Sequence, residues 1–260
     1  MGLYTGLVAN LLFPLQEALK KHNTLVIRRA MDESQWWSPE KLEQYRLERL
    51  RSLLLKAKKN VPYYRDCFSR LDFNPQNVSS LADLDKLPLL TKTIIRTEGD
   101  RMKSEVAKGL ARFNTGGSSG EPLIFFIGTE RVSHDVAAKW RATRWWGVDI
   151  GDPEIVVWGS PIELSAQDRL RQWRDRLMRT QLLPAFQMSE AKLDEFIATI
   201  ARTRPRMLFG YPSSISLLAR HAEKRGQSMS SLGTKVAFVT SERLYEEQRI
   251  VISRVFGCRS

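Results

Sequence analysis

The spacing of apolar residues changes along the chain, from helical periodicity near the start to short strands that alternate with helices further on. Residues 39–59 carry Leu50 and Leu53 on one apolar stripe. Ser38 is a good N-cap, and Pro39 suits the first turn of a helix. The pattern therefore predicts a long amphipathic helix here, ended by the Val-Pro-Tyr-Tyr segment that follows.

The second half repeats an order of strand, turn and helix. Apolar segments at residues 154–158, 207–209 and 235–239, the first of them β-branched, are each followed by turn residues and then by a helical pattern. Strands that alternate with helices predict an α/β fold with a mainly parallel sheet and right-handed crossovers. Residues 133–147 also read as a helix, with Ser133 as its cap.

Ligands of open α/β sheets bind outside the carboxyl ends of the strands. In this chain those ends carry short polar or aromatic turns: Gly159-Ser160, Gly210-Tyr211-Pro212-Ser213 and Thr240-Ser241-Glu242. The sequence therefore predicts a small-molecule cleft along one edge of the sheet.

A loop rich in glycine and hydroxyl residues stands apart from these elements. It has three glycines and three hydroxyl residues between Thr115 and Gly120, and apolar segments at residues 110–113 and 123–127 flank it. The flanks predict a β-hairpin with the loop at its tip, over the same sheet edge. Glycines let successive N–H groups face one concavity, which can hold a phosphate chain. A flexible surface turn is the alternative, and the loop is not a Walker A motif, because Glu121-Pro122 follows it.

The Thr-Gly-Gly-Ser-Ser-Gly-Glu-Pro loop resembles the phosphate-binding loop of adenylate-forming enzymes. Among these it is most similar to the phenylacetate–coenzyme A ligase family, including the related capsular polysaccharide biosynthesis (CapK-like) proteins. Four further segments resemble that family in order and spacing: residues 60–65, 87–92, 209–213 and 239–242. The resemblance runs over nearly the whole chain, although Leu123 stands where many family loops carry Lys or Thr.

The resemblance implies an N-terminal helical subdomain at residues 1–90 and a partial nucleotide-binding α/β core at residues 91–260. It also implies roles for individual residues. The residues expected to hold the ATP phosphates are Thr115, Gly116, Gly117, Ser118, Ser119 and Gly120. Those expected beside the adenine are Ser241, Glu242 and Arg243, and those expected in the acyl pocket are Tyr211 and Trp158. Two structural alternatives stay open: Tyr211 shapes a turn, and Glu242 caps the helix that follows it.

The chemistry implied by the resemblance is attack of a small-molecule carboxylate on the α-phosphorus of ATP, which gives an acyl-adenylate and pyrophosphate. Mg²⁺ would share the phosphate charge, and the thiol of coenzyme A would be the acceptor in the ligases. The catalytic residues stay unassigned, because the sequence offers no obvious covalent nucleophile. No metal-ligand spacing is present, since His22, His134 and His221 are scattered along the chain.

The chain ends before the Tyr-Gly-X-Thr/Ser-Glu motif of the family and before its mobile C-terminal domain. We therefore expect a truncated chain, either a fragment of an acyl-adenylate-forming ligase or a degenerate relative, that is inactive alone. The alternative function is a non-catalytic role in capsular or exopolysaccharide biosynthesis.

Charge adds one further alternative. The net charge is +12, and a dense basic patch at residues 169–179 places Leu170, Trp173 and Leu177 at helical spacing. This predicts an amphipathic helix whose basic face is either solvated or attracted to an anionic ligand or membrane surface. No nucleic-acid-binding motif is recognised.

The cysteines favour a cytoplasmic protein, and the apolar N-terminus leaves peripheral membrane association open. Cys67 and Cys258 form neither a metal spacing nor a disulfide framework. The apolar residues 1–19 lack signal-peptide features and are too few to span a bilayer. They predict a helix that either packs on the protein or lies on a membrane.

Overall fold

The computed structural model describes residues 2–115, 123–159 and 169–260, except for the side chains of residues 169–172. It divides into two compact units, one made of Met1–Lys21 with Lys139–Ser260 and the other of His22–Ala138. Each unit is described by itself. The boundary expected near residue 90 stays a prediction.

The first unit is built on a parallel sheet. Its described strands are β3 (Glu154–Trp158), β4 (Thr180–Pro184), β5 (Met207–Gly210) and β6 (Val236–Val239), in the order β4-β3-β5-β6. All three pairings are parallel, and Val157 lies opposite Gly210 in the β3–β5 register. The predicted α/β class and parallel sheet are confirmed, and β4 is a strand that the sequence pattern had not indicated.

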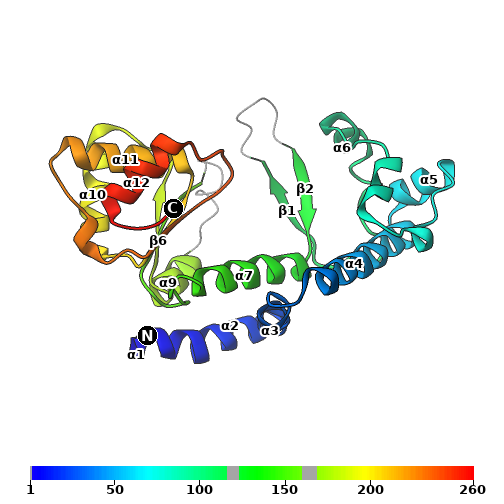
Figure 1. The fold of residues 1–260 in the computed structure, drawn as a ribbon, viewed down its shortest axis with the longest axis horizontal. Coiled ribbons are helices and arrows are strands. Elements are labelled where there is room, and N and C mark those ends of the chain that lie inside the picture. The colour runs from blue at the N-terminus through cyan, green and yellow to red at the C-terminus, as the bar shows by residue number, and fades with distance from the viewer. Residues whose placement is uncertain (1, 116–122, 160–168) are drawn as a thin grey trace. The chain divides into compact units, whose positions relative to one another are not determined.

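One face of this sheet is covered by helices α10 (Glu190–Thr203), α11 (Pro212–Lys224) and α12 (Glu246–Phe256) (Figure 1). Alternate strand residues point toward them, because successive side chains of a strand face opposite sides. Ile155, Val157 and Leu208 are accordingly buried in the same cluster as residues of all three helices. This cluster is the main hydrophobic core of the unit.

The opposite face of the sheet is less enclosed. Val156, Trp158, Phe209 and Phe238 lie on it and are only half-buried. Their side chains include three aromatic rings, so this face presents an apolar and aromatic surface toward the carboxyl end of the strands.

The N-terminal segment packs on the same unit. It forms α1 (Leu3–Leu7), a π-helical turn (Val8–Leu12) and α2 (Phe13–Leu19). Val8 and Phe13 are buried, and the Phe13 ring meets Trp140 edge to face at 5.1 Å between centroids. Leu7, Leu11 and other leucines of the segment stay exposed. One face of the segment is therefore packed on the protein, as one of the two sequence alternatives predicted.

Helix α9 (Arg169–Leu177) confirms the helix predicted for the basic patch. Trp173 and Leu177 are 65% and 51% exposed. Although these residues have helical spacing, their side chains are not buried in the core. Within the described part of the chain, no helix combines the length and apolar character that crossing a bilayer demands.

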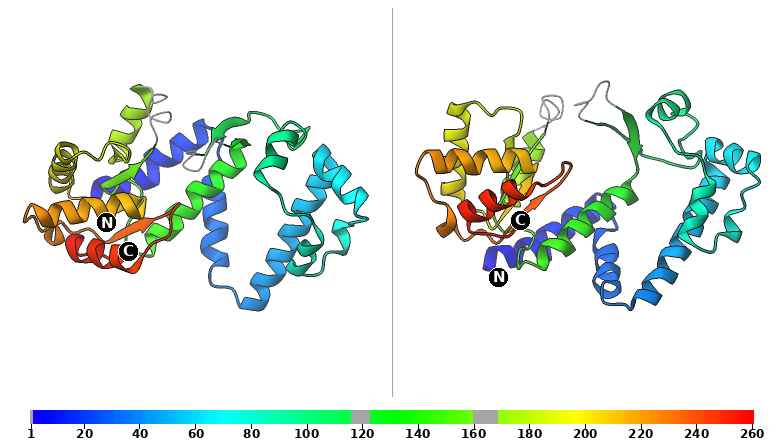
Figure 2. Two further views of the ribbon diagram at one scale, coloured as in Figure 1. Left: turned by 90° about the horizontal axis from the view of Figure 1, so that it is seen from above. Right: turned by 45° about the horizontal axis from the view of Figure 1, so that its top comes forward.

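The second unit is mainly helical and carries the hairpin (Figure 2). Its elements are α3 (Thr24–Ser34), α4 (Pro39–Asn60), α5 (Pro62–Arg70), α6 (Lys92–Glu98), β1 (Ala111–Asn114), β2 (Ile124–Ile127) and most of α7 (Thr129–Arg144). The Ser38 hydroxyl caps α4 by accepting a bond from the Lys41 N–H at 3.3 Å. Leu54, Phe68 and Val78 form its buried core.

The hairpin and α4 confirm the sequence predictions, since β1 and β2 pair antiparallel. The predicted start of the next helix is wrong. Helix α7 begins at Thr129, and Ser133 lies inside it, where its hydroxyl donates to the Thr129 carbonyl at 3.0 Å. The same hydroxyl oxygen accepts a bond from the N–H of Asn23 at 3.2 Å, so Ser133 joins two helices rather than capping one.

Candidate functional site

Trp158 and Tyr211 stack at the carboxyl edge of the sheet, with ring centroids 4.4 Å apart and an angle of 17° between the rings. The register explains this contact. Val157 of β3 is opposite Gly210 of β5, so the residues that follow each of them leave the sheet on the same face. Both predicted acyl-pocket residues are thus brought together.

The close approach of the two strands here depends on Gly210. A Cβ atom at this position would lie 2.2 Å from the carbonyl oxygen of Val157, which no side chain tolerates. Glycine therefore allows β3 and β5 to remain paired up to the point where Trp158 and Tyr211 emerge.

The aromatic surface continues from this stack into the sheet. Phe209 lies 5.9 Å from Trp158 between ring centroids. The ammonium group of Lys139 lies 4.5 Å from the centre of the Phe209 ring and also forms an ion pair with Glu154. Sequence reasoning missed Phe209 and Lys139, although the alternation of β5 around Leu208 places Phe209 on the face of Tyr211.

Glu242 contacts a helix, but not the helix that the sequence alternative named. Its carboxylate accepts a bond from the N–H of Ser213 at 3.2 Å, in the first turn of α11. Helix α12 begins only at Glu246, where Gln248 accepts a bond from the Tyr245 N–H at 3.0 Å. The negative charge of Glu242 therefore lies at the positive end of α11.

The backbone before Glu242 is held close to the sheet edge. The N–H of Thr240 donates to the Gly210 carbonyl at 3.1 Å. Ser241 follows with φ +69°, in the left-handed region that residues other than glycine rarely adopt. Ser241, Glu242 and Arg243 are all exposed, and the Arg243 guanidinium lies 5.2 Å from the centre of the Tyr245 ring. These three side chains are therefore accessible from solvent beside the edge.

The base of the glycine-rich loop is closed by two bonds. The Thr115 N–H donates to the Leu123 carbonyl at 3.0 Å, and the Leu123 N–H donates to the Thr115 hydroxyl at 2.9 Å. The other predicted phosphate ligands, Gly116, Gly117, Ser118, Ser119 and Gly120, lie outside the described residues. Their role, and the meeting of loop and sheet edge, stay predictions.

The residues of this edge offer little for a divalent cation. Across residues 2–115, 123–159 and 169–260, no three or more His, Cys, Asp or Glu side chains gather closely enough to hold a metal ion. Glu242 is a single exposed carboxylate already engaged with α11. We therefore assign no metal ligand among the residues that the structure describes.

Comparison with known proteins adds sequence and structural relatives. No protein-family model matches the chain. It is 24% identical over 202 residues to Protein CapK of Staphylococcus aureus, covering 77% of this chain and 44% of that protein. It is 25% identical over 232 residues to phenylacetate-coenzyme A ligase of Pseudomonas putida, covering 88% of this chain and 52% of that protein. The chain thus spans about half the length of these curated relatives.

Solved structures share the fold. A 2-hydroxyisobutyryl-CoA ligase in the postadenylation state, in complex with R3-HIB-AMP, matches with a TM-score of 0.66 at 19% identity over 85% of this chain and 48% of that one. An open conformation of the ligase, with 2-HIB-AMP and CoA, matches with a TM-score of 0.64 at 19% identity over 85% of this chain and 53% of that one. The chain is thus similar in sequence to CapK and phenylacetate-coenzyme A ligase, and it shares its fold with the CoA ligase structures.

Proposed function

We propose that the chain provides the nucleotide- and acyl-binding part of an ATP-dependent ligase that activates a carboxylate as its acyl-adenylate. The observation that carries this proposal is the Trp158–Tyr211 stack beside Ser241 and Glu242 at the carboxyl edge of a parallel sheet. The matching ligase structures hold acyl-AMP, and one of them also holds CoA. These two facts support a small-molecule carboxylate and a nucleotide as ligands.

The proposed roles follow the chemistry of each group. Thr115 and the glycines and serines after it would direct N–H and O–H donors at the phosphates. Ser241, Glu242 and Arg243 would lie beside the adenine. Trp158 and Tyr211 would wall an apolar acyl group, because stacked rings offer a flat face at low cost in side-chain entropy. Coenzyme A is the proposed acceptor.

Mg²⁺ enters this proposal only with the nucleotide. Magnesium usually keeps several waters and binds through substrate phosphates together with one or two carboxylates. The described residues hold no cluster that would bind it alone. Mg²⁺ would therefore neutralise part of the charge on the ATP phosphates, and the loop would add uncharged N–H and O–H donors to them.

Titration with a non-hydrolysable acyl-adenylate mimic tests the proposal. Tyr211→Ala removes one ring of the stack, worth about 1 kcal/mol, and should weaken binding about fivefold. Glu242→Gln keeps the shape of the side chain and should change affinity for the adenosine part. The matched control is Tyr45→Ala, which removes a ring paired edge to face with Trp37 in the other unit. It should leave binding unchanged.

The outcomes separate the alternatives. Binding of the mimic that depends on Tyr211 supports the proposed site. Pyrophosphate exchange by this chain would contradict the expectation that it is inactive alone and would exclude the non-catalytic role in polysaccharide biosynthesis. Binding that ignores both substitutions, in protein whose circular dichroism matches wild type, would refute the assignment of the site.

A further inference from the structure

A pocket of about 600 Å³ lies at the opposite edge of the sheet, and four arginines line it: Arg144, Arg179, Arg204 and Arg206. Arg179 directly precedes β4 and Arg206 directly precedes β5, while Pro153 of the same pocket precedes β3. In a parallel sheet the amino ends of the strands share one edge. This arginine pocket is therefore separated by the length of the strands from Trp158 and Tyr211.

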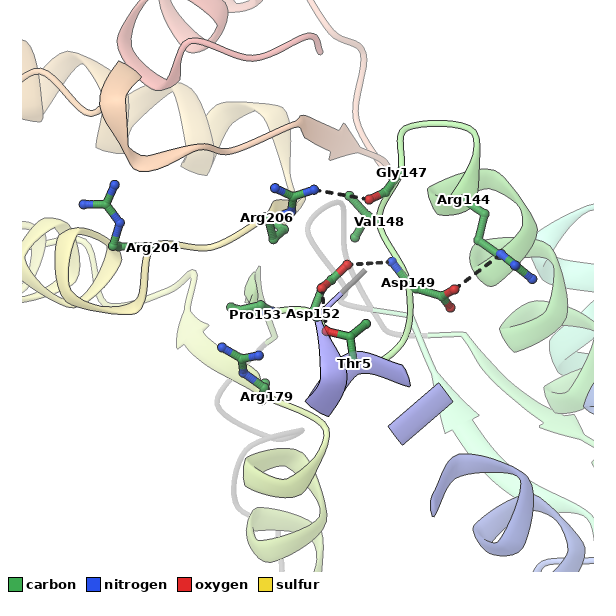
Figure 3. A pocket seen from close by; sticks show the side chains of 11 residues that line it. Thr5, Arg144, Gly147, Val148, Asp149, Asp152, Pro153, Arg179, Arg204 and Arg206 are labelled. Atoms are coloured by element: carbon green, nitrogen blue, oxygen red, sulfur yellow. Dashed lines mark hydrogen bonds and ion pairs between the residues drawn. The ribbon is translucent and has the colours of Figure 1, made fainter. Parts of the chain in front are cut away.

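The acidic residues of the pocket are engaged in holding its own wall together. Asp152 accepts a bond from the Thr5 hydroxyl at 2.8 Å and from the Asp149 N–H at 3.0 Å. Asp149 accepts bonds from the Trp140 indole N–H and from the Ile150 N–H. Figure 3 shows Asp152 between Thr5 and Asp149. These carboxylates fix a turn and anchor the N-terminal helix.

Only one of the four arginines of the pocket forms an ion pair among the described residues. Arg144 pairs with Asp149 at 3.4 Å. Among the residues that the structure describes, Arg179, Arg204 and Arg206 have no ion pair with a carboxylate. Their interactions are weaker: Arg204 donates to the Ser231 carbonyl at 2.8 Å, and Arg206 to the Gly147 carbonyl at 3.5 Å. Arg179 lies 5.6 Å from the centre of the Tyr4 ring. Three guanidinium groups thus line the pocket without an ion pair, and the four lining arginines outnumber the two lining carboxylates, Asp149 and Asp152.

Two of these arginines also hold unfavourable backbone conformations. Arg179 has φ +58° and Arg204 has φ +47°. Arg204 ends α10 in the left-handed conformation, where glycine is the usual residue. Arginine therefore occupies two positions where glycine would fit the backbone better, and both of these arginines line the same pocket.

We propose that the arginine pocket binds a phosphorylated organic molecule, either free in solution or as the headgroup of a lipid. The planar guanidinium group binds phosphate oxygens through two parallel N–H bonds, and several converging arginines without lysine favour that geometry. The volume is within the range of about 300–1,000 Å³ typical of organic ligands rather than of a bare ion.

The surroundings of the pocket fit either source of the phosphate. Gly2 and Thr5 of the N-terminal helix line it, and Leu3 and Leu7 of the same helix are 98% and 46% exposed. The exposed Trp173 lies on α9, whose Leu177 carbonyl accepts a bond from the Tyr4 hydroxyl at 2.9 Å. Apolar side chains beside a cationic pocket are the arrangement found at lipid interfaces. A phosphorylated metabolite would use the guanidinium groups alone.

A competing account is purely structural. Cations stabilise the carboxyl ends of helices, and Arg144 ends α7 while Arg204 caps α10. Arg206 belongs to no helix, and it lies between Pro205 and the start of β5. Helix ends therefore explain part of the charge, but not its convergence on one pocket.

The test measures binding of two probes by the full chain, pyrophosphate by calorimetry and phosphatidylcholine vesicles with or without phosphatidic acid by flotation. The variant R179Q/R206Q removes two charges and leaves a shorter, neutral polar side chain at each position. The control R70Q/R220Q removes two exposed charges that lie outside the pocket. We expect the pocket variant to bind at least about tenfold more weakly than wild type and the control to bind like wild type.

Binding of pyrophosphate that is lost in the pocket variant identifies a soluble ligand. Binding only to vesicles with phosphatidic acid, lost in the same variant, identifies a lipid headgroup. The proposal is overturned if wild type binds neither probe, or if R179Q/R206Q and R70Q/R220Q lose affinity equally. Loss of thermal stability in the pocket variant without any binding by wild type would instead support the helix-end account.

Discussion

Gly210→Ala should be among the most damaging single-atom additions to this chain. The new methyl carbon would lie 2.2 Å from the Val157 oxygen and 3.1 Å from the Val157 Cβ, whereas ordinary contact begins near 3.4 Å. The obstacle is backbone of the neighbouring strand, so no rotamer change relieves it. One of the two central strands has to move by about 1 Å, and we expect a cost of about 3 kcal/mol.

Urea unfolding followed by tryptophan fluorescence measures this cost. With a slope of about 3 kcal/mol per molar urea, the midpoint of the transition that reports the sheet should fall by about 1 M. The stack of Trp158 on Tyr211 directly follows the clash, so the native fluorescence of Trp158 should change as well. Hydrogen exchange should show faster opening of the amides that join β3 to β5.

The matched control is Gly6→Ala. Gly6 lies in α1 with nothing within 4 Å of its new Cβ, so alanine there should be neutral or stabilising by up to about 1 kcal/mol. If G210A unfolds at the wild-type midpoint while its exchange pattern is unchanged, the close approach of β3 and β5 is not as described.

Two further predictions concern titrating groups. Hydrogen bonds from His221 and then from Arg225 lower the pKa of Asp194, so its contribution to stability is present above the unfolded pKa of about 3.9 and is lost as the pH falls through the lower folded value. Asp194→Asn should therefore lower the melting temperature at pH 6, and its difference from wild type should shrink below about pH 4. The control Asp85→Asn should leave the melting temperature unchanged at both pH values. An equal effect of Asp194→Asn at both pH values would contradict this reasoning. Burial raises the pKa of the Cys258 thiol to about 11, so iodoacetamide at pH 8 should label it only after unfolding. Mass spectrometry of the C-terminal peptide gives the labelled fraction, and rapid labelling of the folded protein would contradict the burial of Cys258.

Local signals account for the elements that the sequence predicted well. Helix α4 has a hydroxyl cap, a proline in its first turn and a regular apolar stripe, and all three act within the segment itself. Strand β3 was predicted over its exact bounds, because its β-branched residues end at a glycine and a proline. The hairpin followed from apolar segments on both sides of the glycine-rich loop.

Other features depend on neighbours far away in sequence. Strand β4 contains Gln181 and Pro184 and reads weakly as a strand, but its pairing with β3 stabilises it. Trp173 and Leu177 have the spacing of a buried stripe yet are exposed, because spacing records which residues share a side and not what covers that side. Helix α10 was missed despite its spaced Leu193, Phe196 and Ile200, which form a clear apolar stripe.

The two edges of the sheet also differ in how far local sequence predicts them. Tyr211 and Glu242 could be named because they lie in the turns after β5 and β6, where ligand sites of such sheets gather, whereas Trp158, the last residue of β3, was named from the family resemblance. The arginines of the opposite edge are scattered between positions 144 and 206, and only the strand order places them around one pocket. Their convergence is a property of topology that no local pattern records.

The bond from the Ser213 amide to the Glu242 carboxylate ties together two connections that are 29 residues apart. A ligand that attracts or repels Glu242 would change the charge at the start of α11 at the same moment. In the proposed function, arrival of a nucleotide at the loop after β6 would therefore be transmitted to the segment that follows Tyr211, and nucleotide binding and acyl binding would be thermodynamically linked.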